Sequence, residues 1–383
     1  DVHLPILEKG NASEIRTYIV LNGWITVPTA NTLTIDPGVV LKFQASGIYV
    51  NGRLIAEGQD IAPITFTSYR DATVGADPDG DATELARPND WYGLSFYDSL
   101  FETENLLNHT VVRFAGSVNS ANIYTNASDI TIKNSEISQG NTYGISVYNA
   151  SPTITGNRIW GNNYDGILTN QGGSLPLISF NELSSNGRHG VYVYNNSKAI
   201  LTNNQFYQNR SNGVHNNTAN VVDASNSWWG DADGSGPLHA TNNVSGTGNQ
   251  VADNVTFTPY LTEVQTDYSY RNFSTSTPDT EGSLNALNLL QGSLSDEWGT
   301  TANKTMAWDS NRVELSTDGL DSAKRYKIRV SYFNGDPAAV YQSLTDGDGN
   351  PIHTSFLMPT TPVLYEFAIP QSYYSDGSLT LRF

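Results

Sequence analysis

Four stretches in the middle of the chain decide its fold: TYGISVYN (142–149), YDGILTNQ (164–171), RHGVYVYN (188–195) and SNGVHNNT (211–218). Their glycines, at positions 144, 166, 190 and 213, follow one another at spacings of 22, 24 and 23 residues. Self-similarity at a fixed period of this size is the signature of a solenoid, in which each coil stacks on the last. Apolar and polar residues alternate within each stretch, as in β-strands, without a convincing helical period. The sequence therefore predicts a β-solenoid.

A second set of strands is predicted between these stretches, over residues 130–137, 153–160, 177–184, 201–208 and 221–228. Each contains an asparagine at a bend: Asn134, Asn157, Asn181, Asn204 and Asn226. Amide side chains tolerate the left-handed backbone of a bend and can hydrogen-bond from one coil to the next. Turn formation alone would explain one such residue, but five in register predict a stacked asparagine ladder.

The alternation also predicts which side chains fill the solenoid. We expect an inward orientation for Ile145, Val147, Ile167, Thr169, Val191 and Val193. Each coil buries only a thin layer that its neighbours complete, so a single repeat is not stable alone. The register extends upstream to residues 90–98 and 121–127 and to entry coils within 33–68, and residues 229–261 are expected to close the solenoid.

These stretches carry a family resemblance. The pattern GI-x-V-Y-N-x-S-P-x-I-x-x-N-x-I resembles the right-handed parallel β-helix repeat proteins of bacteria and archaea. The phrases ITVPTANTLTIDPGVVLKF (25–43), PITFTS (63–68) and NSWWGDADGSGP (226–237) are similar to a secreted, cell-surface subset of them. The resemblance covers roughly residues 18–261. It implies the fold but no single activity, because lyases, glycosidases, epimerases, adhesins and inert fibres share this fold.

The composition changes after the solenoid. We expect a parallel β-helix with an N-terminal cap or strand over 1–261, a polar linker over 262–300 and a small antiparallel β-sandwich over 301–383. LDSAKRYKIRVSYF (320–333) and the strands after it resemble sandwich modules appended to bacterial carbohydrate-active proteins. Because the chain starts at Asp1 rather than Met, we expect a mature form or an excised segment. Residues 1–20 are expected either to cap their own first coil or to pair with another subunit.

Composition excludes several classes of function. The 38 acidic and 20 basic residues give a net charge of −18, which excludes a general nucleic-acid binder. The absence of cysteine excludes a disulfide scaffold, a zinc–thiolate site and a cysteine nucleophile. No apolar run approaches the length that crosses a bilayer. A weakly charged surface rich in Ser, Thr, Asn and Gly suits an extracellular or cell-surface location.

Outward positions on the first set of strands form two columns of polar and aromatic residues. The candidate ligand-binding residues in them are Tyr97, Tyr124, Tyr148, Tyr192, Tyr194 and His215. Tyrosine rings beside amides suit sugars, which present C–H faces and hydroxyl groups together. Tyrosine is also a good strand residue on a half-exposed sheet, so a purely structural interpretation stays open.

Asp165, Arg188 and His189 form the charged cluster on the central coils. An Asp beside a His could act as an acid–base pair, with Arg188 orienting a uronate carboxylate. Hydrolysis of glycosides, however, usually needs two well-placed carboxylates, and Glu136, Glu182 and Asp223 are expected on another face. A surface ion pair between Asp165 and His189 is therefore the favoured interpretation.

Calcium is the predicted metal, although a plain solvated acidic loop stays possible. The candidate ligands lie in one long loop and are Asp77, Asp79, Asp81, Glu84 and Asp90. Their oxygens recur at alternating positions, as calcium prefers, but the full twelve-residue calcium-loop pattern is absent. Weaker candidates are the pairs Asp231 with Asp233 and Asp346 with Asp348. The histidines do not cluster in sequence, so zinc is not expected.

Glycosylation sequons occur at Asn11, Asn108, Asn126, Asn149, Asn195, Asn209, Asn216, Asn243, Asn254, Asn272 and Asn303. In a chain so rich in Asn, Ser and Thr they are weakly informative. The sequence as a whole predicts a non-catalytic exported protein that binds extracellular polysaccharide, assembles with copies of itself, or both. The alternative is a polysaccharide lyase or glycosidase that acts along the tyrosine-lined face.

Overall fold

The computed structural model describes residues 1–262 apart from 6, 10–11, 60–61, 79, 81–84, 98–103 and 232. Beyond these it describes 288–291, 293–295, 306–308, 314–317, 320, 326–332, 340–358 and 363–383. The chain divides into two compact units, one of residues 1–80 and 86–265 and one of residues 81–85 and 266–383. Most of the predicted linker, 262–300, falls outside the described residues.

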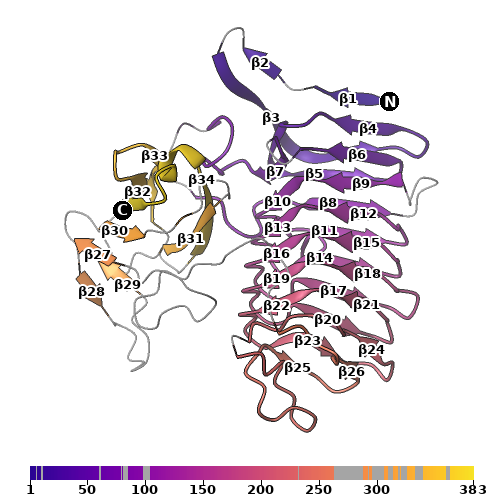
Figure 1. Cartoon of the computed structure of the whole chain (residues 1–383). Coiled ribbons are helices and arrows are strands. Elements are labelled where there is room, and N and C mark those ends of the chain that lie inside the picture. The colour runs from indigo at the N-terminus through magenta and orange to yellow at the C-terminus, as the bar shows by residue number, and fades with distance from the viewer. Residues whose placement is uncertain are drawn as a thin grey trace. The chain divides into compact units, whose positions relative to one another are not determined.

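The first unit is a stack of coils whose strands form two long parallel sheets (Figure 1). The first sheet holds, in spatial order, β1 (Val2–Leu4), β4 (Thr32–Ile35), β6 (Arg53–Glu57), β9 (Leu106–Asn108), β12 (Thr131–Lys133), β15 (Thr153–Thr155), β18 (Leu177–Ser179), β21 (Ile200–Thr202), β24 (Val222–Asp223) and β26 (Val255–Thr256). Strands that are neighbours in this sheet come from successive coils, which is the topology of a parallel β-helix.

The second sheet has two halves that meet in β5 (Val40–Val50). One half continues through β7 (Ile64–Ser68), β10 (Thr110–Arg113), β13 (Glu136–Ser138), β16 (Arg158–Trp160), β19 (Glu182–Ser184) and β22 (Gln205–Tyr207). The other continues through β8 (Gly93–Tyr97), β11 (Ala121–Asn126), β14 (Tyr143–Tyr148), β17 (Ile167–Asn170), β20 (Val191–Tyr194), β23 (Asn212–Asn216) and β25 (Gln250–Val251). Strand β5 turns the corner between the halves at Ala45 (φ 46°) and pairs along its length with β3 (Ala12–Val27).

The interior confirms the predicted side-chain alternation. Ile145, Val147, Ile167, Thr169, Val191 and Val193 are each 0% exposed. Apolar side chains from successive coils join in one continuous cluster that runs through the unit. The prediction of an all-β parallel solenoid is confirmed, and its outward columns are therefore placed on the correct side of each strand.

The predicted asparagine ladder exists, but two of its five members are wrong. Asn157, Asn181 and Asn204 are buried and stack, with side-chain amide to side-chain oxygen distances of 3.0 and 3.1 Å. In the flanking coils, Ser135 and Ser227 occupy the ladder position. The Ser135 backbone N–H donates to Asn157 Oδ1, and the Asn204 backbone N–H donates to Ser227 Oγ. Asn134 and Asn226 sit one residue earlier, in the left-handed corner (φ 49° and 56°).

A second ladder, which the sequence analysis missed, lines the next corner of the coils. Asn162 donates to Asn186 at 2.9 Å, Asn186 to Asn209 at 2.9 Å, and Asn209 to Asn249 at 2.8 Å. The amides of Asn186 and Asn209 also donate to the carbonyls of Ile159 and Leu183 in the preceding coil. Both ladders satisfy backbone groups that the tight corners leave without strand partners.

Residues 1–20 cap their own first coil where they are described. Strand β1 pairs in parallel with β4, and β2 (Leu7–Lys9) folds back antiparallel on β3. Tyr18 donates from its hydroxyl to the carbonyl of Pro5 at 2.8 Å. This is the local-cap arrangement, one of the two predicted for this segment.

The second unit is antiparallel, as predicted. One sheet has the order β27 (Asn288–Gln291), β30 (Glu314–Thr317), β35 (Leu379–Arg382), β32 (Tyr341–Asp346) and β33 (Pro351–Leu357). Two strand pairs accompany it, β31 (Tyr326–Tyr332) with β34 (Val363–Ile369) and β28 (Ser293–Ser295) with β29 (Met306–Trp308). Ile328, Leu344 and Leu381 share one buried cluster, so the five-stranded sheet and the β31–β34 pair share a core. In the described part of the chain, no helix has the length and apolar character to span a bilayer.

Candidate functional site

The candidate site is the outer surface of β8, β11, β14, β17, β20 and β23 with the adjoining parts of β3 and β5, here called the tyrosine face. Parallel pairing aligns the two predicted columns coil by coil: Tyr124 lies opposite Ser95 and Ser146, and Tyr192 opposite Leu168 and His215. The candidates Tyr97, Tyr124, Tyr148, Tyr192, Tyr194 and His215 all point outward and are partly or fully exposed. Their orientation is confirmed; ligand binding by them stays a prediction.

Aromatic rings form a continuous row at the N-terminal end of this face. Trp24 contacts Tyr49 with ring centroids 5.8 Å apart, Tyr49 stacks on Tyr97 at 4.5 Å, and Tyr97 meets Tyr124 at 5.8 Å. Tyr92 lies beside Trp24 at 5.0 Å. Tyr49 and Tyr92 were not among the predicted residues, because the long loop before Tyr92 breaks the 23-residue period, and neither was Trp24, because β3 precedes the regular repeat. A signal was present, since Gly47-Ile48-Tyr49-Val50 matches Gly144-Ile145-Ser146-Val147.

Side-chain amides flank the tyrosine hydroxyls. Asn119 donates to the Tyr97 hydroxyl at 3.3 Å, Gln171 to that of Tyr148 at 3.2 Å, and Asn217 to that of Tyr192 at 3.2 Å. Burial raises the pKa of Tyr124, with smaller contributions from neighbouring tyrosines, so its hydroxyl stays protonated. Each of these hydroxyls can accept from an amide and still donate its own hydrogen to a ligand.

The charged cluster is arranged differently from the prediction. Asp165 is 0% exposed and binds Arg188 through two contacts, Nε to Oδ1 at 2.9 Å and Nη2 to Oδ2 at 2.5 Å. Its Oδ1 also accepts from the backbone N–H of His189 at 3.1 Å, whereas no contact joins it to the imidazole ring among the described interactions. The predicted surface ion pair between Asp165 and His189 is therefore wrong. The hydrogen bond to Asp165 raises the pKa of Arg188.

His189 belongs to an aromatic stack rather than to an acid–base pair. Its ring lies on that of His215 at a centroid distance of 4.5 Å and beside Tyr192 at 5.6 Å. Its Nδ1 accepts from the backbone N–H of Asn212 at 3.2 Å. Burial, with His215 and Arg188 nearby, lowers the pKa of His189 to about 3, so the ring is neutral at pH 7. Arg188 stacks over Tyr192 at 4.6 Å, which completes the cluster.

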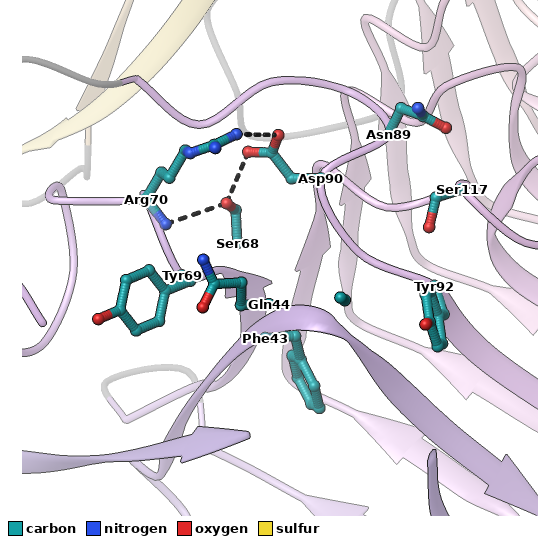
Figure 2. A pocket seen from close by; sticks show the side chains of 10 residues that line it. Phe43, Gln44, Ser68, Tyr69, Arg70, Asn89, Asp90, Tyr92 and Ser117 are labelled. Atoms are coloured by element: carbon teal, nitrogen blue, oxygen red, sulfur yellow. Dashed lines mark hydrogen bonds and ion pairs between the residues drawn. The ribbon is translucent and has the colours of Figure 1, made fainter. Parts of the chain in front are cut away.

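A pocket of about 320 Å³ is lined by side chains that include Asp90 and Tyr92 (Figure 2). It lies where β5 turns its corner, and Tyr92, which contacts Trp24, forms one wall. Asp90 accepts from Ser68 Oγ at 2.6 Å, from the Arg87 backbone N–H at 2.9 Å and from Arg70 at 3.3 Å. Burial raises the pKa of Asp90 above its ordinary value despite these donors. The pocket offers one carboxyl group rather than the pair that glycoside hydrolysis usually needs.

The predicted calcium loop is described only in part. Asp79, Asp81 and Glu84 lie outside the described residues, Asp77 is exposed, and Asp90 is held in the pocket wall. Within the described residues no group of three or more His, Cys, Asp or Glu side chains is placed to hold a metal. Calcium at 77–90 stays a prediction.

The sequons differ in exposure. Asn108, Asn209 and Asn216 are 8%, 5% and 7% exposed, and Asn209 is part of the second ladder, so these three make poor acceptors for a glycan. Asn126, Asn149, Asn195, Asn243 and Asn254 are at least partly exposed. Asn11, Asn272 and Asn303 lie outside the described residues.

Comparison with known proteins agrees with this fold over the central coils. Residues 91–229 match the family model described as the right handed beta helix region. No curated protein matches the sequence. Among solved structures, the chain is similar to the enzymatically active domain of tailspike protein 2 of bacteriophage CBA120, at 11% identity and a TM-score of 0.28 over 97% of this chain and 71% of that chain. A likeness at that score carries no functional argument. The family match and the strand order together make the first unit a right-handed parallel β-helix.

Proposed function

We propose that this β-helix is a non-catalytic extracellular or cell-surface protein that binds a polysaccharide along the tyrosine face. The observation that supports this most is the aromatic row Trp24–Tyr49–Tyr97–Tyr124, whose rings follow one another at 4.5–5.8 Å on successive coils of one rigid sheet. Partly exposed rings in a row offer flat surfaces for the C–H faces of successive sugars, and the flanking amides suit their hydroxyls. A face built on strands holds these groups in fixed positions.

The charges favour a neutral glycan over an acidic one. Arg188, the cation assigned to a uronate from the sequence, has its guanidinium occupied by Asp165. The net charge of −18 repels polyanions at low ionic strength. We therefore propose a neutral polysaccharide as the ligand class.

The same contacts argue against the enzymatic alternative on this face. Asp165 is neutralised by Arg188, and His189 is a weak base, because its pKa is lowered to about 3 and its Nδ1 already accepts from the Asn212 backbone N–H. A lyase or glycosidase needs a free acid or base beside its substrate. Strand-donating assembly is also less favoured, because residues 1–20 pair with their own first coil.

Affinity electrophoresis through gels containing neutral or acidic polysaccharides tests the proposal. We expect neutral polysaccharide to retard the protein, and the pairs Tyr49→Ala with Tyr97→Ala and Tyr148→Ala with Tyr192→Ala to weaken binding about tenfold each, or about 1.4 kcal/mol. The matched control is Thr131→Ala with Thr153→Ala, outward positions on the first sheet. Unchanged binding in both tyrosine pairs, no retardation by any polysaccharide, or release of new reducing ends or unsaturated products would contradict the proposal.

A further inference from the structure

The loop that follows Trp229 buries a carboxyl group in an unusual way. It reads Gly-Asp-Ala-Asp-Gly-Ser-Gly over 230–236, and Asp231 within it is 1% exposed. Asp231 Oδ2 accepts from the backbone N–H of Gly236 at 2.7 Å, which closes the loop on itself. Asp231 Oδ1 is also buried and accepts no hydrogen bond. A buried carboxylate oxygen without a donor is costly, so a positive or donating partner is expected there.

Other buried carboxyl groups of this chain are compensated. Asp165 has the guanidinium of Arg188, and Asp71 has Arg113 with the hydroxyls of Thr67 and Thr73. Although burial alone would raise it, Arg113 and these hydroxyls hold the pKa of Asp71 below its ordinary value. Among the buried carboxyl groups of the described residues, Asp231 is therefore an exception, because one of its oxygens has no partner.

His239, a buried side chain of the same segment, already has its own partners. His239 is 2% exposed, and its Nε2 faces Asp253 at 3.4 Å. Its Nδ1 accepts from the backbone N–H groups of Thr241 and Asn242 at 3.2 and 3.0 Å. None of the described ion pairs of the β-helix involves Asp231.

The loop brings further oxygen atoms to the same turn. Gly230, Gly234 and Gly236 have φ of 76°, 69° and 76°, left-handed values that turn the chain just before Asp231 and again at the amide from which it accepts. Asp233 Oδ1 accepts from Ser235 N at 3.0 Å and from Thr247 Oγ1 at 2.9 Å, so its carboxylate is fixed on the same turn. Carboxylate and hydroxyl oxygens thus alternate at 231, 233 and 235, a spacing that calcium loops use.

We propose that Asp231 ligates a calcium ion held in the loop 230–236. A hard divalent cation is the partner that the unpaired Oδ1 lacks, and calcium completes its shell of 6–8 oxygens with backbone carbonyls and water. With only two carboxylates in the loop, we expect weak binding of the kind found in extracellular modules, with a Kd of about 10⁻⁴–10⁻³ M. This site is separate from the one predicted at 77–90, and it does not depend on glycan binding.

Thermal unfolding of the full chain in chelator and in excess calcium tests this site. We expect calcium to raise the Tm of the wild type by several degrees and to leave the Tm of Asp231→Asn nearly unchanged. In chelator, the Tm of Asp231→Asn should equal or exceed that of the wild type, because the substitution removes the uncompensated charge. Asp223→Asn, which changes an exposed carboxylate outside both acidic loops, is the matched control and should retain the wild-type calcium shift.

Calorimetric titration with calcium alone gives a second readout. Asp233→Asn is the milder variant if Asp231→Asn does not fold, and we expect it to weaken calcium binding at least fivefold. A wild-type Tm that does not respond to calcium would overturn the proposal, and a buried water would then be the partner of Oδ1. A calcium shift that survives in both Asp231→Asn and Asp233→Asn would also overturn it.

Discussion

Phe180 occupies a left-handed corner (φ 56°) that neighbouring coils fill with Asn134, Gly156, Asn203 and Asn226. Left-handed backbone is costly for a bulky side chain and is tolerated by glycine and asparagine. Phe180 is also 63% exposed, so its ring contributes little burial in return. We expect Phe180→Asn to stabilise the β-helix by about 1 kcal/mol, measured by denaturant unfolding. Gly156→Ala, at the same corner one coil earlier, should destabilise it; equal effects of the two changes would contradict this explanation.

His189 makes stability depend on pH. Its pKa falls from an ordinary value near 6.5 to about 3 in the folded chain, because burial disfavours the charged ring. The unfolded chain therefore binds the proton first, and stability is lost as the pH falls from about 6.5 towards 3. His215, whose pKa is also lowered, acts in the same direction.

We expect His189→Gln to lose less stability than the wild type between pH 7 and pH 4. The measurement is the difference in Tm between the two proteins across that range, which cancels the contributions of carboxyl groups common to both. A difference that does not change with pH would show that the ring is protonated as easily in the fold as outside it.

At the scale of the strand and its corner, the ladders decide stability. Asn181 donates to the carbonyl of Ile154 at 2.8 Å and to Asn204, and its oxygen accepts from the backbone and side chain of Asn157. Asn181→Ala would leave several of these buried groups without partners, each worth about 1–3 kcal/mol. We expect a loss of at least about 2 kcal/mol, read from urea unfolding.

Asn163→Ala is the control for that change, since Asn163 is an exposed asparagine of the adjacent coil. It should alter stability by less than about 0.5 kcal/mol. A similar loss in both variants would mean that the ladder contributes nothing specific.

The ladders also mark what the sequence could predict at this scale. Period-two alternation identified the inward residues correctly, because one face of every strand is buried. It could not separate Asn134 from Ser135, because both residues bond to a neighbouring coil: the Ser135 N–H donates to Asn157, whereas the Asn134 amide donates to Asn108. The second ladder was predictable over Asn162, Asn186 and Asn209, which keep the spacings of 24 and 23 residues, but its last step to Asn249 spans 40 residues and breaks the period.

For the candidate site, the sequence predicted which residues face outward but not which side chains contact one another. Strand register placed the tyrosine columns, but it does not fix side-chain rotamers. Asp165 therefore looked able to meet His189 although its carboxylate turns to Arg188 instead. Trp24 could not be placed from the sequence, because β3 is a long strand that precedes the regular repeat.

For the molecule as a whole, the N-terminal segment protects the first coil. Strand β1 covers the free edge of β4, and open strand edges pair with other chains. We expect deletion of residues 1–14 to lower the Tm and to cause concentration-dependent association, measured by light scattering after gel filtration. Replacing the same residues with a glycine–serine segment of equal length should have the same effect. A donor-strand role predicts instead a stable, folded monomer after deletion.

Each ladder bond joins residues only 22–24 positions apart in the central coils, although the sheets are parallel and run the length of the β-helix. Folding of such a chain closes one short loop after another, with no pairing between distant ends, and this favours rapid, stepwise growth over a single slow collapse. Once a first coil has formed on the N-terminal cap, the strands of every later coil can pair with those of the coil before it. During synthesis each turn of chain can therefore dock as it leaves the ribosome, before the second unit has been made.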